Sequence, residues 1–498
     1  MPKTDLERAY LALTEKQVRY TTLFEYYDGL HPLRYTSERL REVFGDREAR
    51  FSQNWAAVVI DSELERIRLK EFTVAKQEQL TQTLNDLFVD TELKLDADDV
   101  HKAALVCGEA FVFVWKDDET NAVEAYYNDP RLCHVFYDPH KPRVKQFAVK
   151  WWVDETDDKR YLNLYYPERI EYYVSKSKAE NVQSWKNFVE AEPNAENPFG
   201  IVPIFHFRPD RRKIKSELTN VIEPQDAINK LMADMMIAAE FGAFKQRWIV
   251  TNADITTLKN SPNEIWTVPA GDGEGENTQV GEFNPTELDN YLKAMERIAN
   301  NIAIISRTPK HYVFSQGGDP SGEALIAMEA PLNKKTQTHI DRFEPAWAQV
   351  AAFVLQLSGA AEIKERDITP TFERPETVQP MTAAQIRQTN VASGIPLNTT
   401  LKREGWTEAE IEDMEAEPPD SKQLVSLVSE VKDDLDPQTF IETIAPAFNW
   451  DETQVAEIVA RILEKQERDV RNAVRGLADS QFGEDDDDDQ ETAEADAA

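Results

Sequence analysis

Two long amphipathic stretches that bracket a short module constrain the fold of this chain more than any other feature. In 217–243 the apolar residues recur at helical spacing: Leu218, Val221, Ile222, Ile228, Leu231, Met232, Met235 and Ala239. In 285–306 they are Leu288, Tyr291, Leu292, Met295, Ile298, Ile302 and Ile305. At about 1.5 Å per residue the first helix is roughly 40 Å long. Such a helix is long for an ordinary globular domain, so the sequence predicts an extended helix pair.

Signals inside and between these stretches refine the prediction. The second stretch opens with NPTE, where Asn284 can cap the helix, Pro285 suits its first position and Glu287 can reach back to the cap amide. The intervening module contains the strand-like runs RWIVT and EIWTVPA, followed by the flexible GDGEGE. The first stretch also carries a polar stripe that we expect to face water: Glu223, Asp226, Lys230 and Asp234.

The N-terminal part predicts a mixed α+β region. Amphipathic patterns indicate helices at 5–28, from about 52 to 68 and from 97 until Gly108. Between 110 and 207 the period changes to two, as in KQFAVKWWVD and RIEYYVS, so we expect an antiparallel meander there.

After the helix pair, the segment TPKHYVFSQGGDPSG breaks the helical pattern. A third long helix is predicted from about Ser321 to Ser358, with kinks or breaks at Pro331 and Pro345. The strand-like DITPTFERP follows. At least four shorter helices then have recognisable starts, at Thr382, Thr407, Asp436 and Asp451.

The charge balance excludes some classes of protein. The 498 residues include 91 Asp and Glu against 56 Lys and Arg, a formal net charge of −35. Proteins that grip nucleic acid neutralise phosphates with clustered cations, so we expect this chain to repel or guide DNA. The last 15 residues hold nine acids and no base, which predicts a disordered tail. We expect no membrane span and no secretion signal.

The sequence offers little that would support catalysis. It has no GxxxxGK[ST], GxGxxG or GxSxG motif in a suitable context. Cys107, Cys133, His134 and His140 lack the spacing of a metal site, and ordinary packing explains them better. The turn GGDPSGEA is interpreted as a hinge or loop rather than a phosphate cradle. We therefore expect no catalytic residues, cofactor or metal.

The order of these elements resembles the portal proteins of tailed phages, in particular those of actinobacteriophages and related long-tailed phages. The stretches that carry the resemblance are YYDGLHPL, FSQNWAAVVIDSELERI, VIEPQDAINKLMADMMIAAEFGAFKQRWI, SGEAL with its following helix, and VASGIPLNTTLKREGW. They span nearly the whole chain except the acidic tail. The fold class expected is α+β, mainly helical, with an α+β wing, a long-helix stem, a small clip and a C-terminal helical crown.

The resemblance implies a division of the chain into named regions. These are an N-terminal α+β wing region at 1–216, a first stem helix at 217–243, a clip at 244–284, a second stem helix at 285–307, a tunnel loop at 308–321, the long kinked helix and returning strand of the wing at 322–378, a crown at 379–480 and a disordered acidic tail at 481–498.

The resemblance also implies partners. It implies a ring, usually of twelve copies, at one capsid vertex of the virion, assembled in the host cytoplasm, through which double-stranded DNA slides without sequence specificity. Terminase large subunit, major capsid protein and a head–tail adaptor are the implied protein partners. Residues expected near the DNA are Lys293, Arg297, Arg307, Lys310, His311, Tyr312 and Phe314; residues expected between subunits are Met232, Met235, Met295 and Ile298.

Alternatives stay open at this point. The four cations could form ordinary ion pairs on helix surfaces, and the apolar stripes could build the core of a monomer. The chain could instead be a metal-dependent nuclease or phosphoesterase that holds Mg²⁺ with carboxylates, or another virion scaffolding protein. The last of these predicts a sustained coiled coil, whereas Pro331 and Pro345 interrupt the longest candidate.

Overall fold

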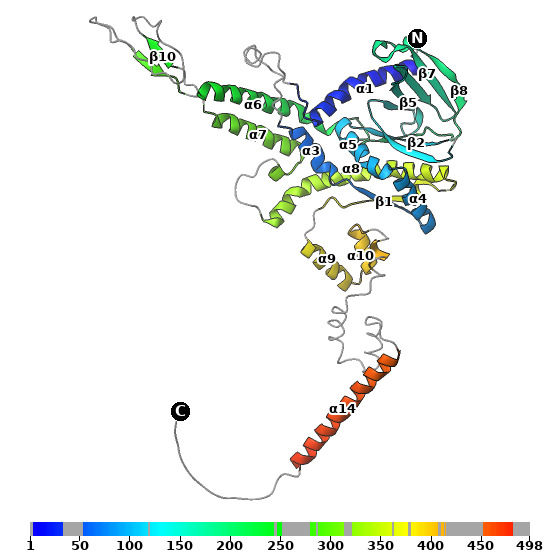
Figure 1. Ribbon diagram of the computed structural model, residues 1–498, viewed down its shortest axis with the longest axis vertical. Coiled ribbons are helices and arrows are strands. Elements are labelled where there is room, and N and C mark those ends of the chain that lie inside the picture. The colour runs from blue at the N-terminus through cyan, green and yellow to red at the C-terminus, as the bar shows by residue number, and fades with distance from the viewer. Residues whose placement is uncertain are drawn as a thin grey trace, which may run out of the picture. The chain divides into compact units, whose positions relative to one another are not determined.

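A computed structural model (Figure 1) describes the following residues: 3–32, 53–117, 120–243, 247–250, 279–284, 287–312, 321–360, 363–376, 380–406, 410–412, 414 and 452–481. The chain divides into two compact units, Met1–Gly405 and Trp406–Ala498. Several predictions lie outside the described residues: the run EIWTVPA, the side chain of Phe314, the helix starts at Thr407 and Asp436, and the acidic tail.

Two antiparallel sheets form the region in which the alternating pattern predicted strands. The larger has the strand order β4-β5-β6-β7-β8, and the smaller has the order β3-β2-β9. The bounds are β2 Ala110–Lys116, β3 Val123–Asn128, β4 Cys133–Tyr137, β5 Lys145–Asp154, β6 Lys159–Tyr165, β7 Arg169–Lys178, β8 Phe188–Glu196 and β9 Ile204–Phe207. The predicted meander is therefore confirmed.

The larger sheet is buried on both faces, which explains its many aromatic residues. On one face Phe147, Val149 and Trp151 pack against Leu13 and Tyr10 of helix α1, Asp5–Tyr27. On the other face the sheet packs against the smaller sheet through Val135, Ala148, Tyr165, Ile170, Phe111, Phe113 and Ile204. The result is three layers: helix, five-stranded sheet and three-stranded sheet (Figure 1).

The main core of the first unit forms around the third predicted long helix, α8 Gly322–Leu357. Around it lie α3 Trp55–Leu64, α4 Glu78–Asp90, α5 Leu93–Cys107 and the antiparallel strands β1 Leu69–Val74 and β12 Ile368–Phe372. Phe343 and Trp347 of α8 are fully buried there. Short 3-10 turns complete the unit: η1 Ala179–Asn181, η2 Trp185–Asn187, η3 Glu217–Asn220, η4 Lys310–Tyr312 and η5 Glu365–Asp367.

Helix α8 confirms one prediction and corrects another. Its N-cap is Ser321, whose Oγ accepts a hydrogen bond from the amide of Ala324 at 3.3 Å. Of the kinks or breaks predicted at Pro331 and Pro345, the breaks are wrong, because α8 continues through both prolines. A kink at either proline stays a prediction. Leu332, Phe343 and Trp347 are fully buried beside them, so tertiary packing outweighs the local cost of proline.

The predicted helix pair consists of α6 Ile222–Ala243 and α7 Asp289–Ser306, which lie side by side in Figure 1. Strands β10 Arg247–Val250 and β11 Gln279–Glu282 pair antiparallel at its end. The start predicted for α7 is wrong: the helix begins at Asp289, after Leu288, without a side-chain cap. A capping side chain contributes only about 0.5–2 kcal/mol, and the first residue of α7 that is buried is Met295.

Three further helices are described in the C-terminal region: α9 Pro380–Ala392, α10 Leu397–Arg403 and α14 Glu452–Gln481. The predicted starts at Thr382 and Asp451 correspond to α9 and α14. Helices α9 and α10 belong to the first compact unit, whereas α14 belongs to the second. No described helix is long and apolar enough to cross a membrane. The observed architecture is α+β and mainly helical, as predicted.

Candidate channel surface and subunit contacts

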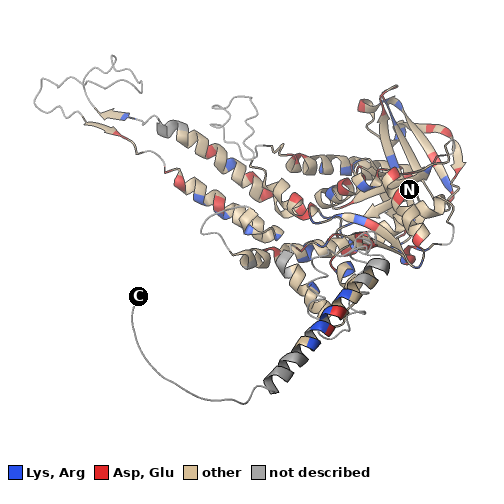
Figure 2. Ribbon diagram, turned by 60° about the horizontal axis from the view of Figure 1, so that its bottom comes forward, with Lys and Arg blue, Asp and Glu red and all other residues tan. Residues whose placement is uncertain are grey.

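The helix pair presents alternating charges to its surroundings. Figure 2 shows acidic and basic residues interspersed along both α6 and α7. Lys230 pairs with Asp234 one turn further along α6. One member of the predicted polar stripe does not face water: Asp226 is buried and accepts a hydrogen bond from the Tyr26 hydroxyl at 2.7 Å. The stripe is therefore broken at the base of α6, where the helix meets α1.

The four cations predicted near DNA do not form a cluster. The ammonium of Lys293 pairs with Asp289 at 2.6 Å, the ordinary helix-surface pair considered above. Arg297 lies exposed one turn further along α7, and Lys310 is exposed in η4. Arg307 ends α7 with a left-handed φ of 64°. Because a non-glycine residue adopts this conformation at some cost, the turn into the following loop is strained.

His311 and Tyr312 are fixed to the rest of the chain at the start of the predicted tunnel loop. The Tyr312 hydroxyl accepts a hydrogen bond from Arg66 at 2.6 Å and donates one to Glu329 at 3.2 Å. His311 lies 3.7 Å from the same Glu329 carboxylate. Arg66 extends from the end of α3, and Glu329 lies in the first turns of α8. The base of the loop is thus clamped between two helices.

The four residues predicted at subunit contacts pack mainly against other residues of the same chain. Met295 is buried, and Met232, Met235 and Ile298 are partly buried, all against the main core. This is the packing expected of a helical core inside one copy. Their role between subunits stays a prediction.

A different apolar set is exposed along the helix pair and its hairpin. Its members are Met236, Leu292, Ile304 and Ile305 on the helices, and Val250, Val280 and Phe283 at the hairpin. The exposed fraction is 60% for Ile304 and 51% for Ile305. Large apolar side chains that a single copy leaves exposed are available for contact with other proteins. We refer to these seven residues as the apolar flank.

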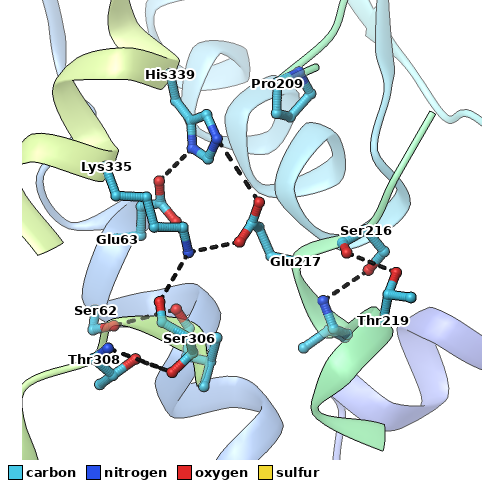
Figure 3. Close-up of polar contacts among 12 residues, drawn as sticks. Ser62, Glu63, Pro209, Ser216, Glu217, Thr219, Ser306, Thr308, Lys335 and His339 are labelled. Atoms are coloured by element: carbon cyan, nitrogen blue, oxygen red, sulfur yellow. Dashed lines mark hydrogen bonds and ion pairs between the residues drawn. The ribbon is translucent and has the colours of Figure 1, made fainter. Parts of the chain in front are cut away.

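A buried network of charges joins the helix pair to α8 (Figure 3). The ammonium of Lys335 lies 2.9 Å from Glu63 of α3 and 2.6 Å from Glu217 of η3. It also donates a hydrogen bond to the carbonyl of Ser306, the last residue of α7, at 3.3 Å. His339, one turn along α8, contacts the same two carboxylates. We refer to Glu63, Glu217, Ser306, Lys335 and His339 as the junction.

The electrostatics of the junction favour the charged forms of Lys335 and Glu63. Burial lowers the pKa of Lys335, but the carboxylates of Glu63 and Glu217 outweigh this and raise it above the usual value. Burial raises the pKa of Glu63, but the hydrogen bond from His339 and the charge of Lys335 bring the net pKa below the usual value. A cavity of about 270 Å³ lies beside the junction. Breaking one buried pair would leave its partner charge uncompensated.

The chemistry of these groups is structural. Cys107 and Cys133 are free and buried. Across the described ranges, no three His, Cys, Asp or Glu side chains are grouped in a way that could hold a metal ion. The charged side chains of the junction contact one another, and three of them, Glu217, Lys335 and His339, also line the cavity beside it.

Sequence reasoning missed the junction and the clamp. Lys335 and His339 are four residues apart, so both lie on one face of α8, but the many other polar residues of this helix hid the signal. Their partners carried no such signal: Glu63 and His339 are 276 positions apart in the chain.

Comparison with known proteins supports the resemblance to phage portal proteins. The family model described as phage portal protein, SPP1 Gp6-like, matches residues 12–423. The portal protein of Mycobacterium phage L5 is 23% identical over 373 residues, covering 69% of this chain and 73% of the relative. The portal protein of Mycobacterium phage D29 is 22% identical over 388 residues, covering 71% and 76%. The chain therefore belongs to the SPP1 Gp6-like family of phage portal proteins, and its function is that of a phage portal, a component of the virion.

Proposed function

We propose that copies of this chain close into a dodecameric ring at one capsid vertex and that double-stranded DNA passes through its channel during packaging and ejection. The observation that carries the proposal is the helix pair, because it projects from the main core and keeps an exposed apolar flank. A single copy leaves these side chains in water. Neighbouring copies in a ring would cover them.

The charge pattern of the helix pair suits a conduit for DNA. Lys293 and Lys230 are paired with carboxylates on their own helices, so they offer phosphates only weak, salt-screened attraction. The surplus of acids over the whole chain repels a duplex. DNA then meets no deep binding minimum and can slide, with the energy for movement supplied by a separate ATPase.

The proposed partners follow the regions of the chain. The hairpin of β10 and β11 belongs to the clip, which would dock the terminase large subunit during packaging and the head–tail adaptor afterwards. The wing would contact the major capsid protein. Assembly would take place in the host cytoplasm, and the ring would catalyse no reaction.

Negative-stain microscopy of the purified chain tests the proposal. We expect closed rings with a central hole, and light scattering should give the mass of a twelve-copy assembly. A monodisperse monomer at every concentration would contradict it. Metal-dependent cleavage of DNA that is lost with a chelator would instead support the nuclease alternative.

A further inference from the structure

A pocket with a strongly basic lining opens at one end of the wing. It has a volume of about 740 Å³ and is bordered by the turn between β4 and β5, the segment after β9, α8 and η5. Its cations are Arg143, Lys145, Arg208, Arg211 and Arg342, and Glu365 is its one acid. We refer to these five cations as the basic pocket.

In the described part of the chain no carboxylate lies within ion-pairing distance of the basic-pocket cations, although the charge of Glu365 acts on Lys145 and that of Arg342 acts on Asp210. Lys145 donates to the carbonyl of Ile204 at 2.7 Å, and Arg342 donates to the carbonyl of Pro209. Arg208 lies over the ring of Tyr137, while Arg143 and Arg211 are exposed. Five cations without an ion pair are unexpected in a chain with 91 acids.

The opposite edge of the same sheet is acidic. Strand β8 has the sequence FVEAEPNAE, and Glu190, Glu192 and Glu196 are exposed on it. Within the described ranges these three carboxylates form no ion pair. Pro193 lacks an amide hydrogen, so the outer edge of β8 is poorly suited to pairing with another strand. We refer to these three glutamates as the acidic edge.

The two features lie toward opposite edges of the larger sheet, because Arg143 and Lys145 of the basic pocket are at the β4–β5 turn and the acidic edge is on β8. The order β4-β5-β6-β7-β8 places the basic pocket at the β4–β5 turn and the acidic edge four strand spacings away; Figure 1 shows β8 at the margin of the sheet. Four spacings of about 4.8 Å give roughly 19 Å. This exceeds the screening length of about 8 Å at physiological salt, so the two charges do not neutralise each other within one copy.

We propose that the acidic edge of one copy docks at the basic pocket of the next copy in the ring. The contact is head-to-tail, since two different surfaces of one chain meet, and this is the kind of contact that closes into a ring. It rests on the ring proposed above and adds the residues through which adjacent wings recognise one another. Opposite charge steers this encounter and fixes its register. A duplex fits the pocket less well because the net charge of −35 repels it.

Reversing either charge set tests the contact. One variant carries Arg143→Glu and Arg211→Glu, and the other carries Glu190→Lys and Glu192→Lys; all four side chains are exposed, so the fold should persist. Close charge pairs at interfaces contribute at least about 1.5 kcal/mol, so each variant should need about ten-fold more protein for half-maximal ring assembly. Matched controls are Lys94→Glu and Asp90→Lys, exposed residues outside both charge sets.

The two variants mixed in equal amounts give the decisive measurement. In an alternating ring the introduced lysines of one variant face the introduced glutamates of the other, so the mixture should assemble at a lower protein concentration than either variant alone. A single chain with all four reversals should do the same. If each reversal variant assembles as the wild type does, or if the mixture stays unassembled, the proposed contact is wrong. The proposal of a ring is unaffected by either result. A wild type that forms no ring would overturn the proposed function as well. Loss of binding to a short DNA duplex in the pocket variant, with assembly unchanged, would show that the pocket serves nucleic acid and would overturn the contact.

Discussion

The body of the chain and its helix pair bury their apolar side chains to different extents. By the body we mean α1, α3–α5, β1–β9, β12 and α8. Its sheets and α8 bury large side chains such as Trp151, Phe343 and Trp347 almost completely within one copy. The helix pair buries residues mainly near its base and keeps the apolar flank exposed. The body thus buries its large apolar side chains within one copy, whereas the helix pair leaves part of its own exposed.

The largest expected effect on the free energy of unfolding is in the body. Trp347 is fully buried in the main core, and its indole donates to His101 at 2.9 Å. Trp347→Ala should lower the free energy of unfolding by about 3–5 kcal/mol. Chemical denaturation followed by circular dichroism measures it. A loss under about 1 kcal/mol would show that the body is less tightly packed than described.

The junction should come next, because it links the two regions. Lys335→Met removes the cation between two buried carboxylates and should cost about 3 kcal/mol. Lys334→Met, its exposed neighbour on α8, is the matched control and should change stability by under about 0.5 kcal/mol. Limited proteolysis near Ser306 should accelerate in the first variant alone. Equal behaviour of the two variants would remove the junction as a stabilising element.

Mild acid should affect the body more than the helix pair. Burial lowers the pKa of His101 and His134 to about 3 and that of His206 to about 4. The unfolded chain binds protons at these histidines below its ordinary pKa of about 6.5. The neutral histidines therefore stabilise the fold above that pH. The free energy of unfolding should fall by about 1 kcal/mol per histidine between about pH 6.5 and 5.5. Denaturation at both pH values measures this, and His101→Phe should reduce the slope.

A charged substitution on the apolar flank should prevent assembly while leaving the folding of one copy unchanged. Ile305→Glu leaves an exposed position exposed, so the free energy of unfolding of one copy should change by under about 0.5 kcal/mol while rings fail to form. Met295→Glu, in the buried part of α7, should destabilise the chain itself. Sedimentation and denaturation of both variants distinguish the two roles. Normal rings from Ile305→Glu would place the subunit contact elsewhere.

The smallest expected effect is that of the acidic tail. Removal of 484–498 takes away nine acids and no described contact. We expect unchanged stability and intact rings by microscopy. Loss of rings would show that assembly depends on the tail.

Features with a local cause could be predicted from the sequence. The alternation of Phe147, Val149 and Trp151 predicted the sheet, and Ser321 predicted the start of α8. Features decided by distant neighbours could not. Helix α8 continues past its prolines because Leu332 and Trp347 are packed in the interior. Asp226 is buried because Tyr26 of α1 donates a hydrogen bond to it. The contact between His339 and Glu63 depends on the whole fold, so no spacing in the sequence indicates it.

Helix α8 has a mechanical consequence. At about 1.5 Å per residue its 36 residues form a strut roughly 54 Å long. Glu329 grips Tyr312 near one end, and Trp347 anchors the other part deep in the interior. Helix α8 is thus one continuous element between the contact with Tyr312 and the packed interior, so a displacement of Tyr312 would reach the main core through a single helix.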